Sequence, residues 1–343
     1  MVLLAACGDS SESSENNTTN DHNNNDDASG ELVIYTARDQ EVVDKVTEMF
    51  NEKYPDIDLE VLTMGAQEIM ERVRGEKENP GGDFWWGGTQ SAFMQATEEG
   101  LLEPYEPSFD DAIEEEHKDP EHHWYGEMLL PEVIMINSDE LTPETAPQDW
   151  DDLLDPEWED EIIIRGVLPS GTMRTIYSAM IYKEDPDDPE KGYEWLEKLD
   201  ANTREYAQDP TNLYLKLARQ EGTISLWNLQ DILIQAHANN QPFDYVVPES
   251  GAPILVDGVG IIKDAKNREN AELFYEFLFE EDTVIELSEE TYQIPSRTDI
   301  DEEAMPEWYQ ELELKELDLD WEVLSENEMD WMEHWDNHIK DQN

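Results

Sequence analysis

One stretch of ten residues, from Arg165 to Arg174, combines side chains that suit the binding of a small anion. It has an arginine at each end and no acidic residue, in a chain that carries 86 acidic and only 21 basic residues. Guanidinium groups form strong, charge-assisted hydrogen bonds with carboxylates and phosphates. This local reversal of charge makes the stretch the first place to expect an anionic ligand.

The residues around this stretch predict how it is folded. An apolar β-branched run, residues 162–164, precedes it, and an amphipathic segment, residues 173–182, follows it. This order predicts a strand, a tight turn and a helix. Ser170, Gly171 and Thr172 would then lie at the amino end of the helix. Backbone N–H groups are unpaired there and the helix dipole is positive, so the turn favours an anion.

Other candidate residues lie at or near the ends of expected strands, where ligands bind in open α/β sheets. Trp86 could stack on a sugar ring, and the two glycines after it either let the backbone approach a ligand or form a tight turn. Asp231 could accept a hydrogen bond from a hydroxyl or an amine. These further candidates are Thr36, Ala37, Arg38, Trp86, Gly87, Gly88, Thr89, Trp227, Asn228, Asp231 and Arg297.

The four candidate arginines differ in their sequence neighbours. Arg38 is followed directly by Asp39, and Arg297 by an aspartate two residues later. Either arginine could therefore pair with a carboxylate of the protein instead of a ligand. Arg165 and Arg174 have no such neighbour. The sequence predicts that removing Arg174 weakens ligand binding.

A hydrolase that uses Ser170 as its nucleophile is the main alternative from another functional class. Such a serine needs a base within hydrogen-bond reach. Most of the seven histidines lie in the polar amino-terminal stretch, an acidic loop or the carboxyl-terminal tail. The sequence contains no nucleophile elbow, phosphate loop, dinucleotide fingerprint or zinc-protease motif. We therefore expect a binding protein without catalytic residues, metal ligands or a cofactor.

Strands and helices alternate along the chain in the order that specifies an α/β fold. Apolar runs of strand length, such as residues 32–35 and 254–262, alternate with segments of helical spacing, such as residues 40–50. This alternation predicts a mostly parallel sheet in each of two similar halves. The polar tail after Pro295 contains four tryptophans and predicts short helices that dock onto one half.

The composition limits the partners of the chain. Its 343 residues carry a formal net charge of −65, so electrostatic repulsion opposes binding to nucleic acids and to anionic membranes. A content of 38% apolar residues and 11 tryptophans indicates a folded core rather than the disorder that high charge often indicates. We expect the acidic residues to coat the surface, and stability to fall in low salt because screening is lost.

The single cysteine, Cys7, lies in a context that matches the bacterial lipobox, Leu4-Ala5-Ala6-Cys7. In that motif the cysteine becomes lipid-modified after cleavage of a signal peptide. Residues 8–30 are almost wholly polar and predict a flexible tether. Residues 1–30 are thus interpreted as a lipid anchor with its tether.

Several segments, in their order and spacing, resemble the extracellular solute-binding proteins of ABC importers, in the branch that includes ferric-ion and hexose-phosphate binders. They are LVIYTAR (32–38), DFWWGG (83–88), EGLLEP (99–104), DPEW (155–158), PSGT (169–172), DGVGII (257–262) with AKN (265–267), and IPSR (294–297). The resemblance implies a type II periplasmic-binding-protein fold, in which hinge strands join two Rossmann-like α/β lobes around a cleft. Lobe 1 would comprise residues 31–136 and 254–343, and lobe 2 residues 137–253.

The resemblance also implies partners and a location. The expected partners are a small anionic solute, an ABC permease in the membrane and, through Cys7, the lipid bilayer. We expect a monomer on the extracellular face of the cell membrane or in the periplasm.

Two ligand classes remain open. In the ferric-ion branch two adjacent tyrosines, shortly after a strand like residues 224–227, hold the metal; residues 227–233 contain no tyrosine here. We therefore expect a phosphorylated sugar, a phosphonate or an organic anion. Ferric iron or an iron chelate is the alternative. His122 and His123, in an acidic loop, are interpreted as exposed residues rather than metal ligands.

Overall fold

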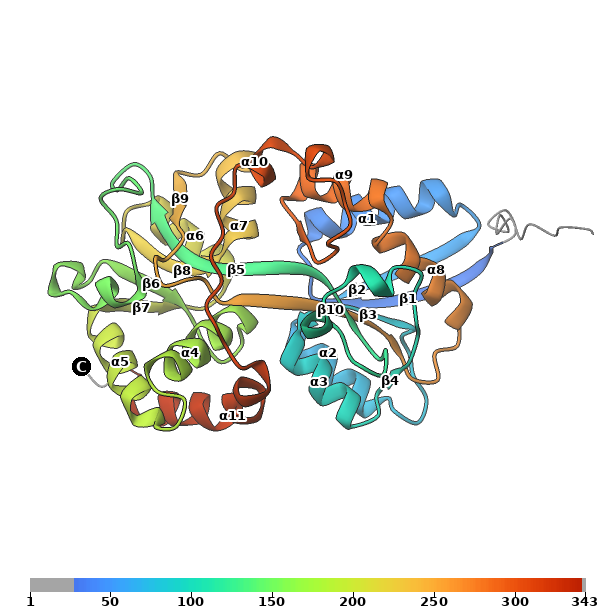
Figure 1. The fold of residues 1–343 in the computed structure, drawn as a ribbon, viewed down its shortest axis with the longest axis horizontal. Coiled ribbons are helices and arrows are strands. Elements are labelled where there is room, and N and C mark those ends of the chain that lie inside the picture. The colour runs from blue at the N-terminus through green and yellow to red at the C-terminus, as the bar shows by residue number, and fades with distance from the viewer. Residues whose placement is uncertain (1–27, 341–343) are drawn as a thin grey trace, which may run out of the picture.

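The computed structural model describes residues 28–340, which form two α/β lobes side by side (Figure 1). Each lobe has strands at its centre and helices packed on both faces. The predicted fold class is therefore confirmed. Within the described residues, every helix is too short or too polar to cross a bilayer.

Lobe 1 is built on parallel strands that are each followed by a helix. β1 pairs in parallel with both β2 and β3, and the helices bury one apolar face, such as Val42, Val46 and Phe50 of α1. The elements of lobe 1 are β1 Gly30–Thr36, α1 Gln40–Lys53, β2 Ile57–Thr63, α2 Ala66–Gly75, β3 Phe84–Thr89, α3 Gln90–Glu98, β4 Leu102–Glu103, the short 3-10 helices η1 Asp110–Ala112 and η2 Glu115–His117, α8 Arg268–Leu278, α9 Glu281–Thr291 and β11 Ile294–Pro295.

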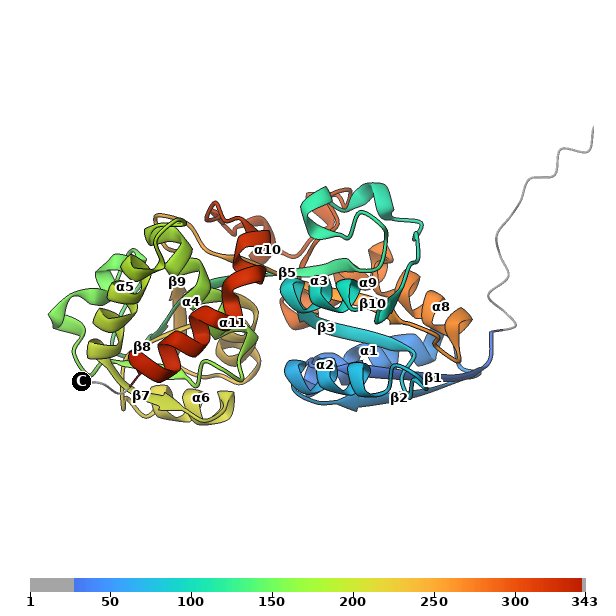
Figure 2. The ribbon, with the colours of Figure 1, turned by 90° about the horizontal axis from the view of Figure 1, so that it is seen from below.

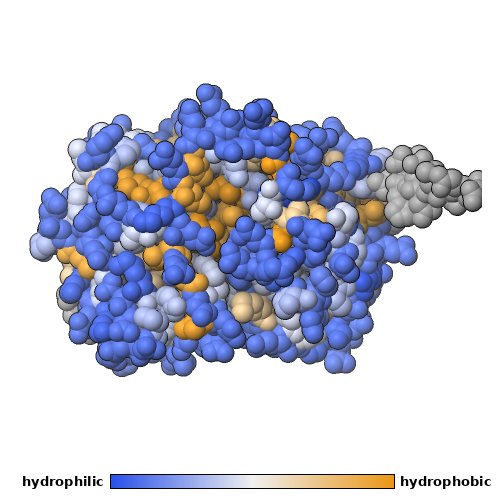
Figure 3. Space-filling view, viewed as in Figure 1, coloured by the Kyte–Doolittle hydropathy of each residue, from blue (hydrophilic) through white to orange (hydrophobic). Residues whose placement is uncertain are grey.

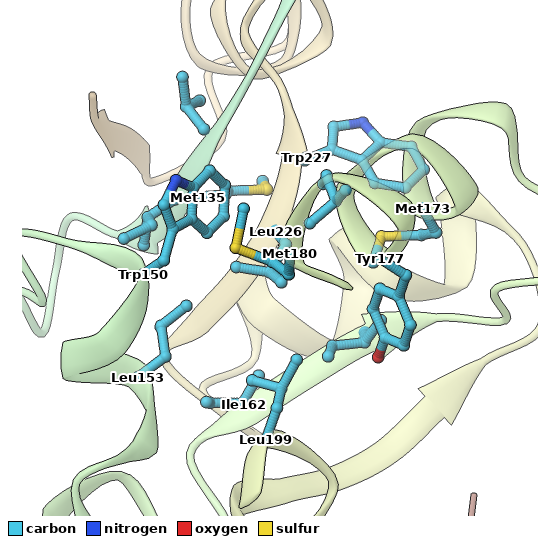
Figure 4. Close-up of a cluster of buried hydrophobic side chains, with 14 of the residues drawn as sticks. Met135, Trp150, Leu153, Ile162, Met173, Tyr177, Met180, Leu199, Leu226 and Trp227 are labelled. Atoms are coloured by element: carbon cyan, nitrogen blue, oxygen red, sulfur yellow. The ribbon is translucent and has the colours of Figure 1, made fainter. Parts of the chain in front are cut away.

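Lobe 2 repeats this architecture around its own core. β6 pairs in parallel with β7 and β8, and Ile162 of β6 packs in a buried cluster with Met180, Leu199 and Leu226 (Figure 4). The elements of lobe 2 are η3 Trp150–Leu154, η4 Pro156–Trp158, β6 Ile162–Arg165, α4 Gly171–Glu184, α5 Pro189–Asn202, β7 Thr203–Ala207, α6 Pro210–Ala218, β8 Ile224–Asn228, α7 Leu229–Leu233 with the π-helical turn η5 Ile234–Ala238, and β9 Phe243–Val246.

Two long strands, β5 Tyr125–Asn137 and β10 Ile254–Ile262, pass between the lobes and join them (Figure 1). They pair antiparallel with each other. β10 also pairs with β3 of lobe 1, and the second half of β5 pairs with β8 and β9 of lobe 2. The strand order is β2-β1-β3-β10-β5-β8-β6-β7. The sheet is therefore mixed, because the hinge strands run against the parallel strands that they join.

The end of the chain packs on lobe 2, which differs from the expected lobe boundaries. Its elements are η6 Glu302–Ala304, α10 Glu307–Gln310 and α11 Trp321–His338. Trp331 and Trp335 of α11 share a buried cluster with Trp150 of lobe 2, and α11 lies along α4 and α5 (Figure 2). α11 also contacts α3 of lobe 1. The tail thus has two short helices followed by one long helix, α11, which packs mainly on lobe 2 instead of lobe 1.

The face drawn in Figure 3 is mostly hydrophilic, and its hydrophobic residues gather mainly toward the middle. This agrees with the expectation that charged residues coat the surface. In the part of the chain that the structure describes, the large apolar side chains with high exposure are Leu168, Leu215 and Met329.

Candidate ligand-binding site

A cavity of about 310 Å³ lies between the lobes, next to the hinge strands. Both lobes and both hinge strands contribute to its wall. The lining residues are Ala37, Arg38, Asp39, Val42, Gly65, Ala66, Gly88 and Thr89 from lobe 1, Met128, Leu130, Leu255 and Asp257 from β5 and β10, and Arg165, Pro169, Gly171, Thr172, Pro210, Trp227, Asn228, Gln230, Asp231 and Ile234 from lobe 2.

The amino ends of six helices meet at this cavity. Residues at the starts of α1, α2 and α3 line it from lobe 1, and those of α4, α6 and α7 line it from lobe 2. Each end carries about half a positive charge and N–H groups without helical partners. Side chains cap α3, α4 and α6, whereas α1 and α2 have no side-chain cap. At α2 the N-cap is Gly65, which has no side chain to occupy these N–H groups.

Arg165, the last residue of β6, is the cavity arginine that remains available to a ligand. Its half-buried guanidinium lies 5.8 Å from the centroid of the Trp227 ring. Within residues 28–340 no carboxylate forms an ion pair with it, and its Nε has no hydrogen-bond partner. Burial lowers the pKa of Arg165, but a guanidinium stays charged in proteins. Its position allows it to bind an anion that enters the cavity.

Arg38, in contrast, is occupied by a buried network. Its Nη2 lies 2.5 Å from Glu127 of β5, and its Nη1 lies 2.7 Å from Asp257 of β10. Burial lowers the pKa of Arg38, but the charges of Asp257 and Glu127 outweigh this effect, so the pKa is raised overall. The same Glu127 carboxylate accepts a hydrogen bond from Trp86 Nε1 at 2.7 Å. Arg38 thus ties the end of β1 to both hinge strands.

Two aspartates from opposite lobes face the same cavity. Asp39 occupies the N-cap position of α1 without capping it, and Asp231 lies in α7. The charge of Asp231, together with burial between the cleft walls, raises the pKa of Asp39 to about 7. Asp231 Oδ2 accepts hydrogen bonds from Trp227 Nε1 at 2.9 Å, Asn228 Nδ2 at 3.0 Å and the Tyr214 hydroxyl at 3.2 Å.

A buried acid that the sequence analysis missed lies behind this wall. Glu132 of β5 is opposite Asn228 in the ladder between β5 and β8, has no exposed surface, and neither of its carboxyl oxygens has a hydrogen-bond partner. Burial raises the pKa of Glu132 well above its usual range, and the charge of Asp231 raises it further. The signal in the sequence was a lone acid within the apolar run of residues 129–136.

The structure brings most of the predicted site residues together. Those that line the cavity are Ala37, Arg38, Gly88, Thr89, Arg165, Gly171, Thr172, Trp227, Asn228 and Asp231. Those that are buried behind its wall are Thr36, Trp86 and Ser170. Trp86 does not face a solute, because its ring is buried against Phe274 of α8. Gly87 has a φ of 88°, and a Cβ there would lie 3.1 Å from Arg38 Nε, so it shapes the wall without lining it.

Arg174 and Arg297 lie outside the cavity, contrary to expectation. Arg174 Nε lies 2.8 Å from Glu328 of α11, and its Nη1 donates to the Leu168 carbonyl at 2.6 Å. Arg297 Nη2 lies 2.7 Å from Asp299. Protein acceptors therefore occupy both arginines, and Arg174 could not be recognised from sequence because its partner lies 154 residues away.

Ser170 is in no position to act as a nucleophile. Its hydroxyl is buried and caps α4 by accepting a hydrogen bond from the Met173 N–H at 3.3 Å. The cavity lining within the described residues includes no histidine that could serve as a base.

The described residues do not form a three-ligand metal site in this cavity. The lining contains no tyrosine, and of its three aspartates Asp257 is held by Arg38. The one described group of three side chains close enough to hold a metal is Glu114, Glu116 and His117, in a loop of lobe 1 outside the cavity. His122 and His123 do not belong to that group; their Nδ1 atoms contact Tyr125 and Asp119 instead.

Comparisons with known proteins agree with this geometry. The model of a family described as bacterial extracellular solute-binding protein matches residues 87–322. An uncharacterized protein of Haemophilus influenzae is 29% identical over 257 residues, 73% of each chain. Iron uptake protein A1 of Synechocystis is 24% identical over 277 residues, 77% of this chain and 75% of its own. The structure of AfuA from Actinobacillus pleuropneumoniae with fructose-6-phosphate bound is 26% identical, with a TM-score of 0.78, covering 91% of this chain and 99% of AfuA.

Proposed function

Because the chain belongs to the family of bacterial extracellular solute-binding proteins, we propose that it captures a small anionic solute in the cleft between its lobes and passes it to the permease of an ABC importer. The solute would be a phosphorylated sugar, a phosphonate or an organic anion. The observation that carries this proposal is the convergence of six helix amino ends and the unpaired Arg165 on one cavity. Both features stabilise negative charge.

The size of the cavity and one relative support a phosphate ester in particular. A volume of about 310 Å³ lies at the small end of the range for ligand pockets. AfuA was solved with fructose-6-phosphate bound. A phosphate would lie against Arg165 and the amino end of α4, and the remainder of the solute would contact Trp227.

Ferric iron is the second candidate, because iron uptake proteins are among the relatives. Phenolate and carboxylate oxygens are the hard donors that suit ferric ion, but the described lining has no tyrosine and its aspartates do not form a three-ligand group. A negatively charged iron chelate would use the same positive groups as a phosphate. We therefore favour an organic anion over the bare metal ion.

The remaining features of this proposal follow from the family. We infer that the protein binds its solute without chemical turnover and works outside the cell membrane. The lipid attachment at Cys7 and the tether lie outside the described residues and stay predictions. A single chain encloses the cleft between its own lobes, so a monomer suffices for binding.

A thermal-shift screen in high salt tests the proposal. The compounds are inorganic phosphate, hexose 6-phosphates, alkylphosphonates, dicarboxylates, ferric citrate and ferric chloride. We expect a phosphate or phosphonate to raise the melting temperature most, since a ligand at 100 times its Kd adds about 2.7 kcal/mol of stability. A response to ferric chloride alone would favour the iron reading, and a response to none of these anions would contradict the proposal.

A further inference from the structure

The charged side chains that line the cavity include more acids than bases, which does not favour a purely anionic ligand. Two arginines, Arg38 and Arg165, face three aspartates, Asp39, Asp231 and Asp257. Since Asp257 and the adjoining Glu127 hold Arg38 in ion pairs, Arg165 is left opposite Asp39 and Asp231. A purely anionic solute would bring more negative charge to a place that already has an excess of it.

The charge of Arg165 acts on both remaining aspartates, but Arg165 forms an ion pair with neither. Neither Asp39 nor Asp231 forms an ion pair with any described lysine, arginine or histidine. Hydrogen bonds to Oδ2 hold Asp231 in place, and no donor is bound at its Oδ1. Asp39 lies on lobe 1 and Asp231 on lobe 2, so both carboxylates border the space where a ligand contacts the two lobes at once.

A further acid lies directly behind this pair. Glu132 is completely buried with both carboxyl oxygens unpartnered, and it is close enough to Asp231 to respond to its charge. Its strongly raised pKa means that Glu132 is held protonated and adds no further negative charge. The groups that suit this end of the cavity to a positive group are therefore Asp39 and Asp231, which line it without an ion-pair partner among the described residues.

We propose that the solute is zwitterionic: its anionic group binds Arg165 and the amino ends of α2 and α4, and a primary amine, as the ammonium ion, binds between Asp39 and Asp231. This inference rests on the proposed function and specifies its substrate class. The ammonium ion donates up to three hydrogen bonds and cancels the repulsion between the lobes. A hydroxyl would donate one hydrogen bond and leave the excess charge in place.

Matched pairs of solutes test this inference by calorimetry. The first pair is 2-aminoethylphosphonate and propylphosphonate, and the second is glucosamine 6-phosphate and glucose 6-phosphate. Each pair keeps the anionic group and approximate size and changes only the amine. We expect the amine to bind more tightly by about tenfold or more in at least one pair, because the ammonium ion is attracted by both carboxylates.

Two variants and a control assign the effect to the carboxylates. Asp39→Asn and Asp231→Asn should each remove most of the preference for the amine while inorganic phosphate still binds. Asp44→Asn, in the same helix as Asp39 but exposed outside the cavity, should keep the full preference.

The outcomes separate this inference from the proposed function. If anions bind but neither amine binds more tightly than its partner, the zwitterion is excluded and the anion site stands. If the preference persists in both aspartate variants, the amine is bound elsewhere and the inference fails. If none of these anions binds at all, the proposed function fails with it.

Discussion

At the scale of single residues, the role of each arginine is decided by the carboxylate that reaches it in the folded chain. Arg38 and Arg174 find their acidic partners 89, 219 and 154 residues away in sequence. The sequence could not show that Arg174 is held by Glu328 outside the cavity lining, because its immediate neighbours contain no acid. Arg165 is unpaired because it ends β6 at the cleft, where the strands of lobe 2 face lobe 1.

The Arg38 network makes a prediction about stability. Arg38→Ala leaves Glu127 and Asp257 buried without their cation, so the free energy of unfolding should fall by about 3–5 kcal/mol. Arg268→Ala removes more exposed pairs with Glu103 and Glu272, so it should cost about 1 kcal/mol or less. Urea denaturation of both variants measures the difference. An equal loss of unfolding free energy in both variants would show that the buried Arg38 network stabilises the protein no more than an exposed ion pair does.

The two cleft aspartates with raised pKa values make a prediction about pH. The pKa of Asp39 is raised to about 7, first by the charge of Asp231, and burial raises that of Asp257 to about 6. Both values exceed the unfolded pKa of about 3.9, so the folded state binds more protons than the unfolded state between these pKa values. The contribution of both groups to the free energy of unfolding therefore falls as the pH rises.

The melting temperature of the ligand-free protein should therefore be lower at about pH 8 than at about pH 6. Asp39→Asn should reduce this difference, because it removes one of the titrating groups, while Asp44→Asn should leave it unchanged. A difference that Asp39→Asn does not alter would mean that Asp39 titrates at its ordinary value.

At the scale of elements, local pattern predicted the parts of the fold that bury continuous apolar runs. Residues 254–262 were expected as a strand and form β10 with the same bounds, and α1 begins at residue 40 as expected. The strand β7 and the helix α9 were missed, because the segments Thr203–Ala207 and Glu281–Thr291 have few apolar residues and a weak period.

The candidate site, like the fold, could be predicted from sequence only in part. Strand ends and helix starts converge at the carboxyl edge of each sheet, so the general place of the cavity and part of its lining could be predicted from sequence. The positions of Trp86 and Arg174 outside the lining could not be predicted, because both side chains are held by residues of distant segments. Arg297 pairs with Asp299, the nearby aspartate that the sequence offered as an alternative to a ligand.

The sequence of α11 does not show which lobe the helix packs on, because its tryptophans could be buried against either lobe. Its burial on lobe 2 makes a prediction: Trp335→Ala should cost about 3–5 kcal/mol of unfolding free energy, since Trp335 is 1% exposed and packs on Tyr177. Met329→Ala is the control within the same helix, and at 73% exposure it should change stability by about 0.5 kcal/mol or less. Similar melting temperatures for the two variants would contradict the docking of α11.

At the scale of the whole molecule, the net charge of −65 sets the conditions under which the fold is stable. Repulsion among surface carboxylates is screened over about 10 Å at 0.1 M salt and about 3 Å at 1 M. The melting temperature should therefore rise steeply with sodium chloride. Sucrose of equal osmolality, which does not screen charge, should raise it much less. Equal melting temperatures in dilute buffer and in concentrated salt would refute this reading of the surface.

The large excess of acidic residues also explains why few positive side chains remain free in the cleft. Most lysines and arginines of the described residues are paired with surface acids. The helix amino ends supply positive polarity to the cavity, and α3, α4 and α6 have no acidic side chain in the first turn that would reduce it. Arg165 adds the one full positive charge that faces a ligand.

The most direct test of the account is a calorimetric titration of three proteins with the tightest-binding phosphate or phosphonate of the screen: the unaltered chain, Arg165→Ala and Arg174→Ala. Loss of the Arg165 guanidinium should weaken binding by about 2–5 kcal/mol, because it is partly shielded from water and has no other partner. Arg174→Ala should bind as the unaltered chain does. An unchanged Kd for Arg165→Ala, or a large loss for Arg174→Ala alone, would contradict the proposed site.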